Sequence, residues 1–170
     1  RDRRTDDRGS SGVTPPPSPA AEYSEDALVQ QPAIAMFGEL GWETADLFQE
    51  WASGKSTEGR EIEHEVILVT RLRAALEKLN PDLASEALDQ AIEELTRDRS
   101  KMVREEANHE VYRLLKDGVR VDVHADDGGW SKEIARIIDW RDPNNNQFFL
   151  ASEFWITGDM YRRRCDLVGF

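Results

Sequence analysis

The sequence contains one cysteine, three histidines and no long hydrophobic run, and each of these scarcities excludes a class of protein. Because Cys165 is the only cysteine, the sequence cannot form an internal disulfide, which fits a reducing compartment. The histidines are far apart in the sequence, so no zinc-ligand spacing is present. No apolar run approaches the roughly 20 residues that cross a bilayer, and the first residues are too polar for a signal peptide. We therefore expect a cytoplasmic protein with no membrane partner.

Acidic residues outnumber basic ones, and their distribution indicates where DNA could bind. The formal net charge is −12. Residues 23–118 hold 11 basic and 21 acidic side chains, whereas residues 119–170 hold 7 basic and 9 acidic ones. A phosphate backbone repels net acidity and attracts a local cluster of cations. If the protein contacts DNA, we therefore expect the contact in the C-terminal part.

The sequence divides into a tail and one folded region. Residues 1–22 include the stretch "GSSGVTPPPSPAA", whose composition is typical of a disordered tail. Residues 23–170 form the predicted domain. Its first helix has Ser24 as a predicted N-cap and contains Pro32, so it either kinks or restarts there before Gly41 ends it.

Three further helices are predicted from apolar residues at helical spacing. They cover residues 61–79, 83–96 and 100–117. In the last of them, Ser100 is the expected N-cap and Gly118 the expected end.

From residue 119 the hydrophobic period changes from helical to alternating. "VRVDVHA" (119–125) places every second valine on one face, as a half-buried strand does. "QFFLASEFWIT" (147–157) is apolar on both faces and predicts a central strand. Further strands are predicted at 133–140 and 165–170, and residues 42–48 are either a short strand or a loop. Helices followed by neighbouring strands predict an α+β fold, with the N-terminal helices packed on a mixed sheet.

The last ten residues, "YRRRCDLVGF", place three arginines directly before an aspartate at the start of an apolar strand. A carboxylate there is costly to half-bury unless an arginine or a bound cation pairs with it. Strand alternation places Val168 and Phe170 on the face of Asp166. From the residues alone, the arginine run is either a binding cluster or a solvated end.

Four blocks of sequence, in order, resemble the N-terminal region of type I restriction enzyme R subunits. The resemblance extends over residues 23–170, and the start "SEDALVQQPAIAMFGELGWE" is also similar to that family. The four blocks are "LRAALEKLNPDLASEALDQAIEEL" (72–95), "NHEVYRLLKDGVRVDV" (108–123), "IIDWRDPNNNQFFLASEFWITG" (137–158) and "RRRCDLV" (162–168).

The resemblance implies a PD-(D/E)xK endonuclease domain and assigns a role to the end of the chain. Asp166 matches the first aspartate of that motif, a catalytic residue that ligates Mg²⁺. Arg162, Arg163 and Arg164 resemble the basic residues that hold DNA phosphates beside it. The Glu-x-Lys strand that completes the site, and the ATP motor of R subunits, lie outside this sequence. The resemblance therefore implies an incomplete restriction-endonuclease-like core.

Two residues depart from the family pattern. Cys165 stands where a proline usually precedes the aspartate, and it changes the backbone but removes no ligand. Glu153 stands where an amide side chain is more common. Its carboxylate could reach the metal or serve as a polar partner in the core.

The expected function follows from this resemblance. The chain is expected to be a fragment of the DNA-cleaving subunit of a type I restriction-modification system, inactive by itself. The parent protein is expected to use Mg²⁺ and ATP, and to bind DNA together with modification and specificity subunits. The alternative is a truncated, non-catalytic module that docks on partner subunits through its acidic helices.

Overall fold

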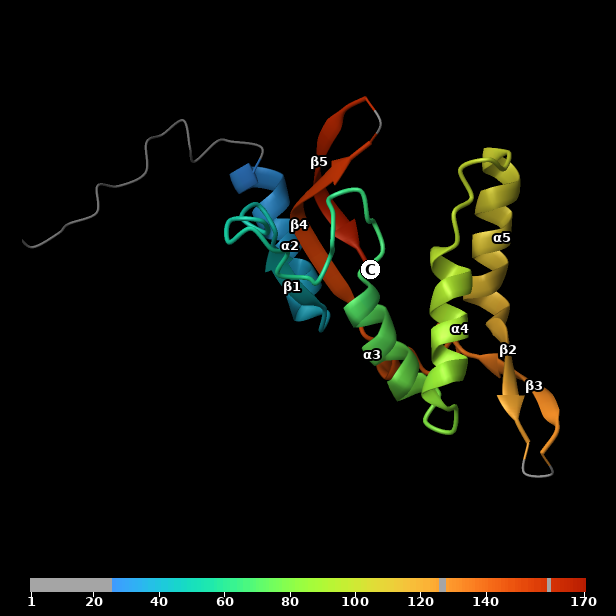
Figure 1. Ribbon diagram of the computed structural model, residues 1–170. Coiled ribbons are helices and arrows are strands. Elements are labelled where there is room, and N and C mark those ends of the chain that lie inside the picture. The colour runs from blue at the N-terminus through green and yellow to red at the C-terminus, as the bar shows by residue number, and fades with distance from the viewer. Residues whose placement is uncertain (1–25, 126–127, 159) are drawn as a thin grey trace, which may run out of the picture.

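The computed structural model describes residues 26–125, 128–158 and 160–170 (Figure 1). The predicted tail, residues 1–22, and the predicted cap Ser24 lie outside these residues. In the described part of the chain, every helix is too short or too polar to cross a bilayer. The elements are a π-helical turn (Asp26–Gln30), α2 (Gln31–Glu39), β1 (Glu43–Asp46), α3 (Val69–Leu79), α4 (Ser85–Thr96), α5 (Arg104–Asp117), β2 (Val119–His124), β3 (Trp130–Ala135), a 3₁₀ turn (Pro143–Asn145), β4 (Phe149–Thr157) and β5 (Arg162–Gly169).

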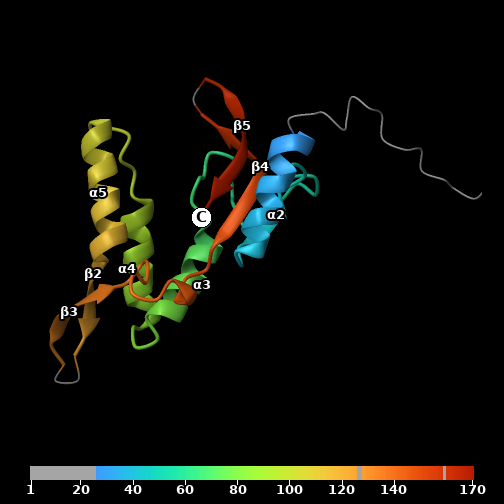
Figure 2. The same cartoon turned by 180° about the vertical axis from the view of Figure 1, so that it is seen from behind.

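The fold is α+β, as the sequence predicted, and its described strands form two sheets. In the first sheet β4 is central, with β1 parallel on one side and β5 antiparallel on the other. The second sheet is the antiparallel hairpin of β2 and β3. Figure 1 shows α2 beside the first sheet and α4 and α5 beside the hairpin, with α3 between the two groups. The view from behind shows the same separation (Figure 2).

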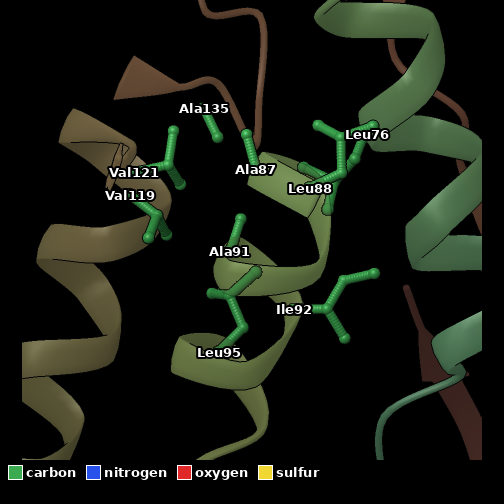
Figure 3. Close-up of a cluster of buried hydrophobic side chains, with 9 residues drawn as sticks. All are labelled: Leu76, Ala87, Leu88, Ala91, Ile92, Leu95, Val119, Val121 and Ala135. Carbon is green, nitrogen blue, oxygen red and sulfur yellow. The ribbon is translucent and has the colours of Figure 1, made fainter. Parts of the chain in front are cut away.

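Each group of elements has its own hydrophobic core. The core of the hairpin group forms because α4 turns one apolar stripe toward α3, β2 and β3, and Leu76 lies beside Leu88 in Figure 3. Burying one leucine side chain contributes about 1.5–3 kcal/mol. The members of this core are Leu76, Ala87, Leu88, Ala91, Ile92, Leu95, Val119, Val121 and Ala135. The core of the first sheet comprises Leu47, Leu68, Phe149, Ala151 and Phe154.

Several element boundaries differ from the predictions. Helix α3 starts at Val69 and not at residue 61, because the preceding backbone carbonyls of Glu63 and Glu65 accept hydrogen bonds from Arg60, at 3.4 and 3.0 Å. Helix α5 starts at Arg104 and not at the predicted cap Ser100. Ser100 lies in a turn, where its backbone N–H donates a hydrogen bond to the Asp98 carboxylate at 2.8 Å.

The hairpin strand β3 also differs from its prediction, because it spans 130–135 and not 133–140. Buried Asp139 prevents the longer strand. Its carboxylate accepts backbone N–H bonds from Arg141 and Asp142 and a side-chain bond from Asn145, which fold the chain into a turn.

Other local predictions are confirmed. Helix α2 starts at Gln31 with Pro32 in its first turn, so Pro32 lies near the first position of that helix as one predicted alternative had it, although the preceding π-helical turn runs directly into α2. Gly41 and Gly118 follow their helices with φ of +87° and +84°, a conformation that glycine adopts at low cost. Strand β4 is central and its first four residues are buried, as its continuous apolar run predicted.

Candidate functional site

An open pocket of about 450 Å³ lies against the first sheet, where β1, β4 and β5 meet the start of the helical region. Three of its lining side chains are carboxylates, and no described nitrogen or sulfur metal ligand lines it. The lining residues are Gln30, Gln31, Asp46, Phe48, Ser152, Glu153, Arg164 and Asp166. The pocket thus collects oxygen donors from four separate segments of the chain.

Asp166 lies on β5, is exposed, and lines this pocket. The sequence suggested that an arginine or a cation would have to pair with it. Among the residues that the structure describes, nothing donates a hydrogen bond to its carboxylate and no cation pairs with it. Only its backbone carbonyl is contacted, by the Gln30 side chain at 3.4 Å. The carboxylate is therefore free to bind a ligand.

The three arginines lie within β5 and not before it, so alternation separates them onto two faces. Arg162 donates two hydrogen bonds to the Glu63 carboxylate, at 2.8 and 2.6 Å, and its guanidinium lies 4.0 Å from the centre of the Trp155 ring. The hydrogen bond from Arg162 is the main cause that lowers the pKa of Glu63. Arg164 forms an ion pair with Glu153 at 2.8 Å. Arg163 forms no ion pair with any described residue, so two of the three guanidiniums are already occupied.

Glu153 interrupts the pairing of β4 with β5 directly opposite Asp166. The paired residues on either side are Ser152 with Leu167 and Phe154 with Cys165, whereas no such pair joins Glu153 to Asp166. Glu153 has a φ of +58° and is the one non-glycine residue with positive φ in the described ranges. Such a conformation costs about 1–3 kcal/mol and persists only where the surroundings hold it.

This interruption changes which residues share a face of the sheet. Ser152 and Glu153, although consecutive, both line the pocket. Beyond the interruption, Val168 and Phe170 pack in the core of the first sheet together with Cys165. The prediction that they lie on the face of Asp166 is therefore wrong, because it assumed regular alternation.

The Glu153 side chain is only 15% exposed and has one hydrogen bond and one ion pair, since its buried Oε2 accepts no hydrogen bond from the described residues. Gln30 donates a hydrogen bond to its Oε1 at 2.9 Å, and Arg164 approaches its Oε2. Sequence reasoning missed Gln30 and Asp46 as pocket residues, because neither belongs to a recognisable motif. Asp46 uses one carboxylate oxygen to accept the N–H of Phe48 at 2.8 Å, which fixes the turn after β1.

A buried ion pair fixes the chain behind β4. The side chains of Arg60 and Glu50 are both fully buried and form a bidentate contact. Arg60 also donates to the carbonyl of Trp155 on β4 at 3.1 Å, and its guanidinium lies 4.2 Å from the Phe154 ring centre. These contacts attach residues 47–65 to the strand that carries Glu153.

A second arginine connects β1 to α3. Arg71 donates to the carboxylates of Glu43 and Glu58 and lies 3.6 Å from the centre of the Phe149 ring. The hydrogen bonds from Arg71 lower the pKa of Glu43, and the same bonds raise the pKa of Arg71. Both arginines therefore support the sheet and are not available to a ligand.

Comparison with known proteins decides the family. A family model described as "Type I restriction enzyme R protein N terminus" matches residues 22–170. The chain belongs to this family. The type I restriction enzyme HindI endonuclease subunit of Haemophilus influenzae is 34% identical over 107 residues, which are 62% of this chain and 10% of that subunit. The match thus spans about a tenth of the length of that curated relative.

Membership of the R-protein family confirms the resemblance that the four sequence blocks indicated. It does not test the assigned residues. The roles of Asp166 and of the three arginines stay predictions, as does the PD-(D/E)xK character of the site. Within the described ranges, no group of three or more His, Cys, Asp or Glu residues is arranged to hold a metal ion.

Proposed function

We propose that this chain is the N-terminal part of the DNA-cleaving subunit of a type I restriction enzyme, and that Asp166 ligates the Mg²⁺ of its PD-(D/E)xK endonuclease site. The observation that carries the proposal is the Asp166 carboxylate, which has no partner among the described residues and lines an oxygen-rich pocket. An exposed carboxylate that has no partner in the described part of the chain is accessible to a cation.

The donors present fit Mg²⁺ better than a transition metal. Magnesium prefers oxygen ligands, keeps several waters, and usually takes only one or two protein carboxylates together with substrate phosphate. Asp166 supplies one such carboxylate, and Asp46 lines the same pocket. The lack of a three-residue metal cluster in the described part of the chain agrees with a site to which another segment contributes ligands.

The chemistry of the proposed site follows from its charges. A Mg²⁺ ion at this position would polarise the scissile phosphate and lower the pKa of a bound water. Asp166 would orient the ion, and Arg164 is the one of the three arginines that lines the same pocket, where it is paired with Glu153. Arg163 has no ion pair in the described ranges, but it lines a separate pocket. Each arginine–phosphate contact is a charge-assisted hydrogen bond without sequence preference.

Further properties of the parent protein are part of the same proposal. Its relative is named as an endonuclease subunit of a type I restriction enzyme. We therefore propose that the complete protein cleaves DNA, uses ATP through a motor outside this chain, and assembles with modification and specificity subunits in the cytoplasm.

Metal titration of the purified 170-residue chain tests the role of Asp166. We expect Mg²⁺, followed by isothermal calorimetry or amide NMR, to bind the wild type and to shift signals around Asp166. Asp166→Asn should abolish this binding, whereas Asp82→Asn, which removes an exposed carboxylate before α4, should not. Equal binding by both variants would place the metal elsewhere and contradict the proposal. In the longer parent protein, the expected effect of Asp166→Asn is loss of DNA cleavage.

The docking alternative has one observation in its favour. Helix α5 has no fully buried residue, and α4 carries four carboxylates and no basic side chain. An acidic surface of this kind suits a basic partner protein. If the chain bound partner subunits tightly but neither metal nor DNA, this second function would be favoured.

A further inference from the structure

A carboxylate and a guanidinium face each other inside the pocket, on neighbouring strands. Glu153 Oε2 and Arg164 Nη1 are 2.8 Å apart. The glutamate is 15% exposed, whereas the arginine is 43% exposed and extends toward solvent. The buried member of the pair is thus the anion, and the accessible member is the cation that a phosphate could contact.

The position of Glu153 is imposed by its surroundings and not by local preference. A glutamate at φ +58° occupies a backbone region that side chains with a β-carbon disfavour. Gln30 holds the carboxylate by a 2.9 Å hydrogen bond, and the same amide group reaches the Asp166 carbonyl. One side chain from the helical region thus contacts both Glu153 and the backbone of Asp166.

We infer that Glu153 is a positioning residue that holds the Arg164 guanidinium inside the Asp166 pocket, in competition with a DNA phosphate. The inference rests on the proposed function, because it takes the phosphate as the competing anion. Carboxylate and phosphate oxygens bind the same face of a guanidinium. Arg164 must therefore leave Glu153, at least in part, before it can contact DNA.

The pair of Arg162 with Glu63 shows why the competition is specific to the pocket. That pair has the same chemistry, but Glu63 also accepts a bond from Thr157 and neither residue lines the pocket. Displacing Glu63 would bring no phosphate close to Asp166. Displacing Glu153 would place a phosphate between Arg164 and the Asp166 carboxylate, where the proposed metal acts.

A double-mutant cycle on DNA binding separates this coupling from a simple charge effect. The 170-residue chain is titrated with a fluorescent duplex at several salt concentrations in EDTA, as wild type, Glu153→Gln, Arg164→Ala and the double variant. Glu153→Gln should strengthen binding and steepen the log–log salt slope by about 0.9, the contribution of one phosphate contact. In the Arg164→Ala background, the same change should add no slope.

Three results would overturn the inference. If Glu153→Gln strengthened DNA binding equally in the wild type and in Arg164→Ala, the gain in affinity would come only from the loss of a negative charge. An equal gain in affinity from Glu61→Gln would lead to the same conclusion. No change in Glu153→Gln, or no DNA binding by any variant even at low salt, would show that Glu153 does not compete with phosphate. The magnesium titration of Asp166 is independent of these measurements, so a failed cycle leaves the proposed metal site tested separately.

A measurement on the wild type covers the case in which Glu153→Gln does not fold. The Arg164 side-chain N–H and the Gln30 side-chain amide are followed by NMR while the unlabelled duplex is added in EDTA. Both signals should shift together, because Gln30 reports the release of Glu153. Shifts at Arg162 or Arg163 without a shift at Gln30 would refute the competition.

Discussion

The buried ion pair of Glu50 with Arg60 gives the sharpest prediction for stability. Both side chains are 0% exposed, and Arg60 additionally donates to carbonyls of Glu65 and Trp155. Glu50→Ala leaves the Arg60 guanidinium buried without a counter-charge. The backbone carbonyls that Arg60 contacts are still present, but they carry no full charge. Removing one partner of a buried pair typically costs about 3–5 kcal/mol. That is a large part of the roughly 5–15 kcal/mol by which a domain is stable.

The assay is urea or thermal unfolding followed by tryptophan fluorescence. Trp51 lies 5.6 Å from the Arg60 guanidinium and reports on this region. For a chain of this size, each kcal/mol shifts the melting temperature by about 2–4 °C. We therefore expect Glu50→Ala to lower it by roughly 6–20 °C.

A matched control separates burial from pairing. Asp89 pairs with Arg73 on the surface, with side-chain exposures of 57% and 34%. Asp89→Ala should cost only about 0–1 kcal/mol, because water screens the charges and replaces the lost contact. If Glu50→Ala and Asp89→Ala have equal effects, Arg60 is solvated in solution and the reasoning from burial is refuted.

Three further predictions follow from the site, from one turn and from the tail. The 170-residue chain with Mg²⁺ should not linearise a plasmid, and metal-dependent cleavage that Asp166→Ala abolishes would contradict this. Hydrogen bonds from Asn145 and two backbone N–H groups lower the pKa of Asp139, so its contribution to stability is present above its unfolded pKa of about 3.9 and is lost as pH falls through the folded value. In Asp139→Asn, the free energy of unfolding should therefore fall less steeply as the pH is lowered. An unchanged dependence on pH would exclude this role of Asp139. Deleting residues 1–22 should leave the melting temperature unchanged, as measured by calorimetry, and a fall of several degrees would show that they pack.

The sequence predicted well those helices and strands that are specified by a regular local spacing of apolar residues. Helix α4 and strand β2 each bury one regular stripe, and the observed bounds agree within two residues. The start of α3 could not be predicted in this way. The residues before it have helical spacing, but Arg60 binds their carbonyls outside a helix, and that contact depends on the tertiary position of Glu50.

The candidate site was predictable only in part, for a similar reason. Asp166 was found through its resemblance to a motif. Asp46 and Gln30 reach the pocket from distant segments that have no motif. The left-handed backbone of Glu153 has no sequence signal, because glutamate is not a residue that favours positive φ. Its effect on strand alternation also reversed the predicted face of Val168.

The pairing of the terminal arginines predicts that the cationic run gives this acidic domain only a weak affinity for DNA. A phosphate must displace Glu63 or Glu153 before it gains Arg162 or Arg164. Arg163, which has no ion pair in the described part of the chain, would contribute a salt slope of only about −0.9. The net charge of −12 opposes even this contact. We therefore expect the DNA binding of this chain to be weak and to disappear as the salt concentration rises. If Asp166 binds the metal as we propose, Glu153 would limit the contacts that a phosphate makes with Arg164 in the same pocket.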